Sequence, residues 1–204
     1  AFATLYNVKN VKFLGCTFRN TAPNAFAASD RGIGIISIDA NYFLQPFSLT
    51  QPCKFENLYY GIDASNVSNL NTISCKQAEF TGCSQGMFLT NNKNATIISN
   101  DFNIGYTGDI DPYGLYLNKC TGYQVEDNYF HSSKVGNDYG TIINQTGFTY
   151  NQIYRNRHQT VMIGTQYQGN TFSAPVQIKC NNYSLVSAAS TDIAITSGWT
   201  LPLN

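Results

Sequence analysis

The amino-acid sequence predicts an all-β fold, a right-handed single-stranded parallel β-helix of about seven coils with roughly 22–28 residues in each. Two observations carry this prediction. The segments that begin at three glycines have nearly the same sequence pattern: GMFLTNNKNATIISNDF, GLYLNKCTGYQVEDNYF and GTIINQTGFTYNQIYRNRH, the last with two residues inserted. These glycines belong to a series with gaps of 27, 25, 28 and 26 residues: Gly34, Gly61, Gly86, Gly114 and Gly140. Such a period is typical of a solenoid, because one repeat cannot bury its own apolar face and must stack on the next.

The expected coils follow one another along the chain. One coil ends at Phe18, and irregular corners are expected around residues 23–31. Full coils start near the five glycines, and a less regular last coil includes residues 169–172 and the run DIAIT at residues 192–196. Each coil should hold two or three short strands, since no stretch shows a convincing 3.6-residue apolar period. The expected hand is right, because parallel connections are right-handed in nearly all proteins.

Stacking of equivalent residues about 4.8 Å apart predicts ladders of side chains inside the solenoid. One wall should hold an aliphatic ladder: Ile35, Ile62, Met87, Leu115 and Ile142. Another should hold an aromatic ladder: Phe18, Phe55, Phe80, Phe102 and Phe130. Asn100 and Asn128 occupy the corner before the aromatic ladder, with Asn156 displaced by the insertion, and their amides are expected to pair with the backbone or with one another.

Composition excludes several classes of function. Charged residues make up 12% of the chain, half the share of about 25% that is usual in globular proteins. The net charge is zero, so we predict neither a nucleic acid nor an acidic membrane as partner. No apolar stretch reaches the roughly 18 residues of a membrane span. No catalytic Ser/His/Asp signature, phosphate-binding loop or dinucleotide fingerprint is present.

The six cysteines fit no metal-binding pattern, because the sequence holds no C-x-x-C pair. We expect thiols that pack in the interior as small apolar side chains. One or two disulfides in a secreted protein are the alternative. Two of the cysteines, Cys16 and Cys75, fall near the asparagine position of their coils.

We expect residues 1–204 to form a single β-helix domain. The first 18 residues already match the later coils, so the chain reads as a fragment of a longer secreted protein. An uncapped solenoid end exposes unpaired strand edges. End-to-end or neighbouring-domain contacts are therefore expected.

Three long excursions between strands are where function is expected, since a solenoid displays its insertions on one face: residues 20–32, 105–112 and 131–139. The second contains Asp109 and Asp111, two residues apart, and Asp101 lies one corner earlier. Three carboxylates could bind calcium, which is the one cofactor that the sequence suggests. An Asp-Pro turn that begins the next coil explains the same residues without a metal.

Both histidines and two arginines follow consecutive coils: His131, Arg155, Arg157 and His158. If the protein is an enzyme, these residues together with Asp109 and Asp111 are the catalytic candidates. A lyase needs a base beside a neutralised carboxylate, and a glycosidase needs two nearby carboxyl groups. Polar corner residues on a solenoid surface explain the same cluster. The aromatic residues near corners, Tyr42–Phe43, Tyr59–Tyr60 and Tyr106, could stack on sugars or simply alternate along strands.

The repeats resemble a known group. The units GLYLNKCTGYQVEDNYF and GTIINQTGFTYNQIYRNRH, followed by QIKCNNY and DIAIT, are similar to the PbH1-type parallel β-helix repeats of large secreted or surface proteins of Bacteroidetes-type bacteria, over roughly residues 60–196. This resemblance implies a secreted or outer-membrane-associated location. The wider β-helix group also includes pectate lyases, polygalacturonases and phage tailspikes, so the fold leaves the function open. The paired-aspartate pattern of polygalacturonases is absent from the sequence.

Two functional hypotheses follow. The first is a non-catalytic surface or adhesion module that presents its corner loops to a polysaccharide, a cell-surface glycan or a protein partner. The alternative is a polysaccharide-active enzyme, a lyase or a glycoside hydrolase, with a groove along one face. Convergence of carboxylates, or of a carboxylate and an arginine, in one groove would favour the enzyme. Dispersal of these residues around the rod would favour the module.

Overall fold

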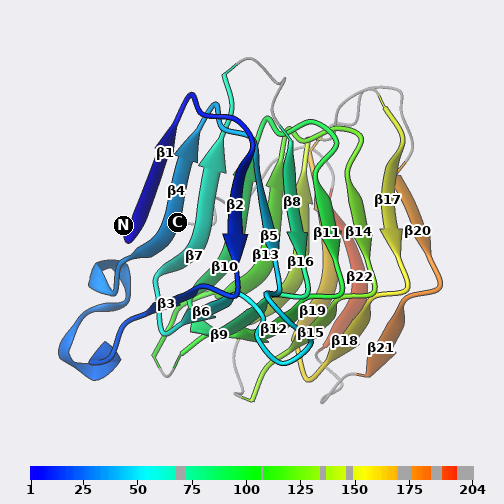
Figure 1. The fold of residues 1–204 in the computed structure, drawn as a ribbon. Helices are drawn as coiled ribbons and strands as arrows, with labels where there is room; N and C mark the ends of the chain where they lie inside the picture. The colour runs from blue at the N-terminus through cyan, green and yellow to red at the C-terminus, as the bar shows by residue number, and fades with distance from the viewer. Residues whose placement is uncertain are drawn as a thin grey trace.

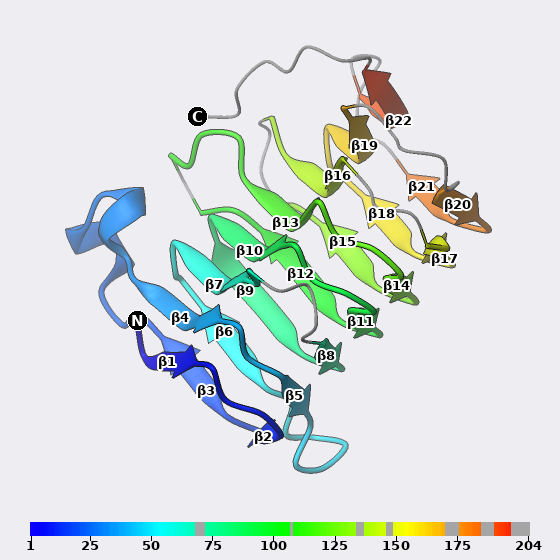
Figure 2. The ribbon, with the colours of Figure 1, turned by 90° about the horizontal axis from the view of Figure 1, so that it is seen from above.

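The computed structural model describes residues 1–67, 72–106, 108–133, 137–145, 149–169, 176–184 and 190–196. The chain winds into a β-solenoid whose three parallel sheets each run along the rod (Figures 1 and 2). Successive strands enter sheet A, sheet B and sheet C in turn, so that one coil consists of three strands. The prediction of an all-β parallel β-helix is confirmed.

Sheet A contains β1 (Ala3–Tyr6), β4 (Ile33–Ile38), β7 (Tyr60–Ser65), β10 (Gln85–Thr90), β13 (Tyr113–Asn118), β16 (Tyr139–Asn144), β19 (Ile163–Gln168) and β22 (Thr191–Thr196). Sheet B contains β2 (Val11–Leu14), β5 (Tyr42–Gln45), β8 (Ile73–Lys76), β11 (Thr96–Ile98), β14 (Gln124–Glu126), β17 (Asn151–Tyr154) and β20 (Val176–Lys179). Sheet C contains β3 (Thr17–Arg19), β6 (Lys54–Glu56), β9 (Glu79–Cys83), β12 (Asp101–Ile104), β15 (Tyr129–His131), β18 (Arg157–Gln159) and β21 (Asn182–Ser184). Two short 3₁₀ turns, Pro23–Ala25 and Ala28–Asp30, are the helical elements of the described residues, and neither could span a membrane.

The described part of the chain supplies eight strands to sheet A and seven to each of the others, close to the seven coils expected. The end of the solenoid is more regular than the sequence analysis predicted. Gly164 is a sixth glycine of the series and holds the second position of β19, as Gly140 does in β16. Of the expected last-coil segment 169–172, residues 170–172 lie outside the described residues.

The recurring glycine is explained by what lies against it. A Cβ atom at four of these glycines would lie only 2.6–2.9 Å from a ring carbon in sheet C of the same coil: Gly34 against Phe55, Gly61 against Phe80, Gly86 against Phe102 and Gly114 against Phe130. Real Cβ atoms do not approach carbon so closely, since overpacking forces the core apart. The glycine column therefore makes room for the aromatic ladder.

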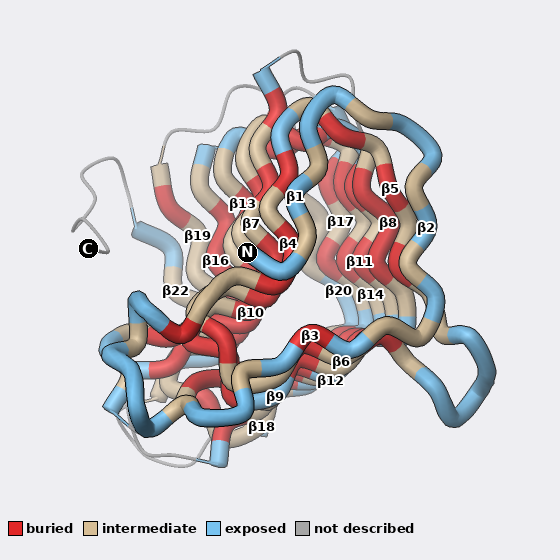
Figure 3. The backbone as a smooth tube through the Cα atoms, turned by 60° about the vertical axis from the view of Figure 1, so that its left-hand side comes forward, coloured by how far each residue is buried: buried red, intermediate tan, exposed pale blue. Residues whose placement is uncertain are grey.

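The predicted aromatic ladder is present and is longer than expected. Its rings stack with centroids 4.6–5.0 Å apart and planes 6–13° from parallel, and the order is Phe18, Phe55, Phe80, Phe102, Phe130, His158 and Tyr183. This ladder lines the interior that the three sheets enclose (Figure 3, red). His158 thus replaces a phenylalanine in the core.

The aliphatic ladder of sheet A is as predicted except at one coil. Leu115 pairs with Thr141, not with Ile142. The residue directly after each glycine faces inward, so Gly140 places Thr141 in the ladder. Cys75 pairs with Ile97 in the interior ladder of sheet B, and it lies near the asparagine corner as expected, because its thiol donates to Asn100 Oδ1 at 3.4 Å. All six cysteines are free thiols.

Asparagines form a buried ladder at the corner between sheets B and C. Asn100, Asn128, Asn156 and Asn181 follow one another, so Asn156 is in line and is not displaced as predicted. In each step the backbone N–H and the side-chain amide donate to Oδ1 of the next asparagine at 2.8–3.1 Å. The side-chain amide also donates to a carbonyl one coil away, for example Asn128 to Ile97 at 2.9 Å. Since buried amides are satisfied in this way, the ladder fixes a tight corner.

The three predicted excursions all lie at the corner from sheet C to sheet A. Residues 20–32 join β3 to β4, residues 105–112 join β12 to β13, and the third joins β15 to β16 with residues 134–136 outside the described part. A further excursion, residues 46–53 between β5 and β6, was not predicted. It projects from the rod (Figure 3) and exposes Phe47 and Leu49.

The fit between glycine and ring can be tested by a double-mutant cycle at Gly114 and Phe130. Gly114→Ala should cost about 2 kcal/mol by overpacking, and Phe130→Ala should cost about 3 to 5 kcal/mol by opening a cavity. The double variant should cost less than the sum, because removal of the ring leaves room for the new methyl group. Urea unfolding measures all three, with Phe43→Ala on the outer face of sheet B as the control. Strict additivity would contradict the proposed contact.

Candidate functional site

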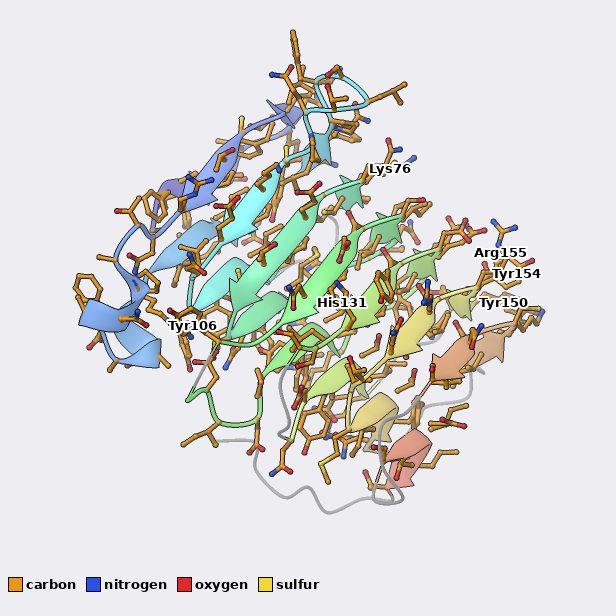
Figure 4. All side chains as sticks on the ribbon, turned by 90° about the horizontal axis from the view of Figure 1, so that it is seen from below. Lys76, Tyr106, His131, Tyr150, Tyr154 and Arg155 are labelled. Carbon is orange, nitrogen blue, oxygen red and sulfur yellow. The ribbon has the colours of Figure 1, made fainter. Side chains whose placement is uncertain are left out.

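The structure brings together two of the six catalytic candidates, His131 and Arg157, at the ring of Tyr129, and it places the other four elsewhere. Tyr106 belongs to the same excursion as Asp109 and Asp111. Figure 4 shows Tyr106 at the opposite side of the molecule from Arg155, and His131 on sheet C lies between them. His158 does not reach the surface at all. The dispersal follows from the alternation of strand residues, which sends neighbours such as Arg157 and His158 to opposite faces.

His158 is a core residue rather than a base in a groove. Its ring lies between Phe130 and Tyr183 at centroid distances of 5.0 and 4.8 Å. Neither ring nitrogen has a hydrogen-bond partner among the described residues. Burial lowers the pKa of His158 to about 3, because the charged imidazolium would lose its hydration. The imidazole is therefore neutral and packs as an aromatic ring.

Of the other cationic candidates, the structure brings His131 and Arg157 together on the ring of Tyr129 and places Arg155 in a different surface contact. The His131 ring stacks on Tyr129 at a centroid distance of 4.3 Å. His131 Nε2 lies 2.8 Å from Asp101 on the outer face of sheet C. Arg155 lies at the corner between sheets B and C, where its Nη2 is 2.6 Å from Asp127. Arg157 lies over the ring of Tyr129, with its guanidinium carbon 4.7 Å from the centroid. Surface contacts of this kind contribute little to stability, because water and salt screen them.

The three carboxylates considered for calcium do not form a cluster. Asp101 pairs with His131, whereas Asp109 pairs with Arg31 and Asp111 lies at a corner with a positive φ of 47°. No group of three or more His, Cys, Asp or Glu side chains that could hold a metal ion occurs within the described ranges. In the described residues Asp111 instead belongs to the corner that leads through Pro112 into β13, as an Asp-Pro turn would.

Two of the excursions meet and enclose a pocket of about 280 Å³. Arg31 and Asp109, 78 residues apart, form an ion pair of 2.5 Å in which both side chains are almost fully buried. The Tyr106 ring covers the guanidinium at 5.0 Å, and its hydroxyl donates to Asn24 Oδ1 at 2.6 Å. These contacts fasten the excursion 20–32 to the excursion 105–112, which we call the corner clamp.

The clamp engages both carboxylate oxygens of Asp109 but not the whole guanidinium, because the buried Nη1 of Arg31 has no hydrogen-bond partner among the described residues. Asp109 Oδ2 also accepts the backbone N–H of Tyr106 at 2.6 Å, so both carboxylate oxygens are engaged. The guanidinium charge of Arg31 is balanced by the same carboxylate. Sequence reasoning identified Asp109 but missed Arg31, because the contact depends on two loops three coils apart.

A second surface feature lies on the outer face of sheet A. Five aromatic residues form a continuous row across β7, β10 and β13, which we call the outer aromatic strip: Tyr59, Tyr60, Phe88, Tyr113 and Tyr116. In the spatial order Tyr59, Tyr60, Phe88, Tyr116 and Tyr113, successive ring centroids lie 4.7, 6.2, 5.2 and 5.5 Å apart. All of the rings except Tyr113 are partly exposed.

Register and hydrogen bonds hold the strip in place. Phe88 pairs with Tyr116 on the neighbouring strand, and both point outward because their neighbours in sequence are buried. Gln85 links the tyrosines, since it accepts from the Tyr113 hydroxyl at 2.7 Å and donates to the Tyr59 hydroxyl at 3.3 Å. The strip is thus a rigid surface on regular strands.

The sequence predicted only part of this strip. Tyr59 and Tyr60 were named as sugar-stacking candidates, but Phe88, Tyr113 and Tyr116 were not. The signal was present, because all strip residues except Tyr59 lie one position before or two positions after one of the glycines. Tyr42 is different: it is fully buried, and its hydroxyl accepts a hydrogen bond from Ser37 at 3.2 Å. Tyr42 and Phe43 therefore alternate along β5, which is the second of the two interpretations given for these rings.

We compared the chain with family models, curated proteins and solved structures, and none of them matches it. The solenoid is of the type that PbH1-like repeats form. The site must be interpreted from its own geometry.

His158 makes stability sensitive to acid. The unfolded histidine takes up a proton below about pH 6.5, whereas the folded one resists protonation down to about pH 3. Stability is therefore retained above pH 6.5 and falls as the pH drops toward 3, by roughly 3 kcal/mol at pH 4.5. His158→Phe should remove this contribution, as seen in thermal melts at several pH values. His131→Gln should leave it, and equal acid sensitivity of wild type and His158→Phe would refute the assignment.

The buried ion pair of the corner clamp gives a second test. Asp109→Asn removes the carboxylate charge and leaves Arg31 buried without its counter-ion, which should cost about 3 kcal/mol in urea unfolding. Glu79→Gln breaks the exposed pair with Lys54 and should change the free energy of unfolding much less, because water screens this pair. Similar costs for the two variants would show that the clamp is not a buried pair in solution.

Proposed function

We propose that this protein is a non-catalytic β-helix module that binds glycans through the outer aromatic strip. The row of partly exposed rings across three consecutive coils is the observation that carries the proposal. Contiguous exposed apolar surface of this kind marks binding sites in soluble proteins. Tyrosine rings suit sugars, because each ring offers a flat apolar face and a polar hydroxyl at its edge.

The shape of the strip favours an extended ligand. Neighbouring strands lie about 4.8 Å apart, so rings on three strands extend about 10 Å along the rod. This length matches a short stretch of a polysaccharide better than a single small molecule. The rings alternate with polar side chains such as Gln85 and Thr90, which supply hydrogen-bonding groups for sugar hydroxyls.

The dispersal of the catalytic candidates supports a binding module over a lyase or glycosidase. Acid–base chemistry needs its groups within reach of one reacting atom. Among the described residues, Asp109 pairs with Arg31 in the corner clamp and Arg155 pairs with Asp127 at another corner. His131 and Arg157 meet at the Tyr129 ring, where His131 pairs with Asp101, so these candidates are divided among three places. The proposal also includes a surface or adhesion role outside the cell. This part is supported by the resemblance of the repeats alone.

Alanine substitution on the strip tests the proposal. Binding of a panel of neutral, amino and acidic oligosaccharides is measured by calorimetry, and Tyr60→Ala and Tyr116→Ala should each weaken the best ligand about tenfold or more. Tyr150→Ala removes a ring that is 75% exposed but lies off the strip, and it should have no effect. The proposal fails if no glycan binds, or if all three variants bind alike.

A further inference from the structure

Charge is unevenly distributed over the three sheets. The strands of sheet A contain only two charged residues, Asp63 and Asp192, and no cation. The cationic side chains of the strands lie instead in sheets B and C: Lys12, Arg19, Lys54, Lys76, Arg157 and Lys179. Lys93 and Lys119 follow β10 and β13 at the corner toward sheet B, beyond the strand ends. The face that carries the aromatic strip therefore has a local excess of negative charge.

Asp63 lies within the strip. It occupies the outward position of β7 between the inward Ile62 and Ala64, and it pairs in register with Phe88 on β10. It has no hydrogen-bond or ion-pair partner among the described residues. Burial raises the pKa of Asp63, because the carboxylate has lost part of its hydration. Asp63 is thus a partly desolvated carboxyl group without a counter-ion.

We propose that the outer aromatic strip prefers a glycan with free amino groups, whose ammonium pairs with Asp63. This inference rests on the proposed function, since it names the class of glycan that the same strip binds. A ligand ammonium supplies the positive charge that sheet A lacks and forms a charge-assisted hydrogen bond with the carboxylate. The ring of Phe88 lies beside Asp63 in register, and the ring of Tyr60, three residues earlier on β7, lies next to Phe88, so both can face the sugar and its cation.

The same arrangement predicts that other glycans bind more weakly than glycans with free amino groups. A neutral glycan keeps the stacking and hydrogen bonds but leaves Asp63 without a counter-ion. An acidic glycan brings a second carboxylate to a face without a strand cation, and like charges in a partly desolvated site repel each other. Acidic polysaccharides should therefore bind weakest.

Three hexasaccharides of similar size test this order: a glucosamine hexamer, its N-acetylated counterpart and a galacturonate hexamer. Calorimetry at about pH 6 keeps the sugar ammonium charged. The wild-type protein should bind the glucosamine hexamer about tenfold more tightly than the N-acetylated form, and the acidic hexamer about tenfold more weakly still. Asp63→Asn should abolish the preference for the amine while leaving the N-acetylated hexamer unchanged. Asp101→Asn, on sheet C, should keep it.

The outcomes separate the inference from the proposed function. Equal affinity for the amine and N-acetylated hexamers, or an unchanged preference in Asp63→Asn, overturns the role of Asp63. If Tyr116→Ala still abolishes binding in that case, the strip remains the glycan site. A loss of preference in Asp101→Asn points to unspecific attraction of a polycation and also overturns the inference. Absence of binding to every hexamer overturns both proposals.

Discussion

The close approach of glycine and aromatic ring across the interior is the constraint on which the solenoid depends. In the coils that begin with β4 to β19, the ring from sheet C and a backbone oxygen of the next coil occupy the space that a Cβ atom would need in sheet A, as Phe102 and Gly114 do at Gly86. The ring stacks on its equivalents at 4.6–5.0 Å, close to the spacing of parallel strands, so one contact sets the width of a coil and the register between coils. The asparagine ladder then fixes the next corner through buried amide hydrogen bonds.

This constraint explains how much the sequence could predict. The glycine period and the phenylalanines of sheet C can be recognised in the sequence because each recurs in five coils or more, although β1 has no glycine and His158 and Tyr183 replace phenylalanine in later coils. His158 was misassigned because its residue type suggests chemistry, whereas its position, two residues after Asn156, is that of a ladder ring. The pairing of Arg31 with Asp109 could not be predicted, since it depends on the three-dimensional path of two irregular loops.

The inward and outward positions of the sheet A strands differ in what restricts their residue types. Inward positions of sheet A are restricted to residues such as Met87 and Leu115 that complete the core. Outward positions are free of this restriction, yet on three neighbouring strands they hold aromatic rings beside an uncompensated Asp63. Exposed rings on a rigid sheet have no structural role that the core requires, which is why a binding role is the economical explanation. The corner clamp supports the loop from which Tyr113 enters this strip.

The stacked ladder is tested most directly by nuclear Overhauser contacts between selectively labelled phenylalanine rings. The account predicts contacts from Phe55 to Phe80, from Phe80 to Phe102 and from Phe102 to Phe130, in the order of the coils and without contacts that skip a coil. Rings that contact one another in any other order, or strand pairing that is antiparallel, would contradict the register from which the strip and the clamp are derived.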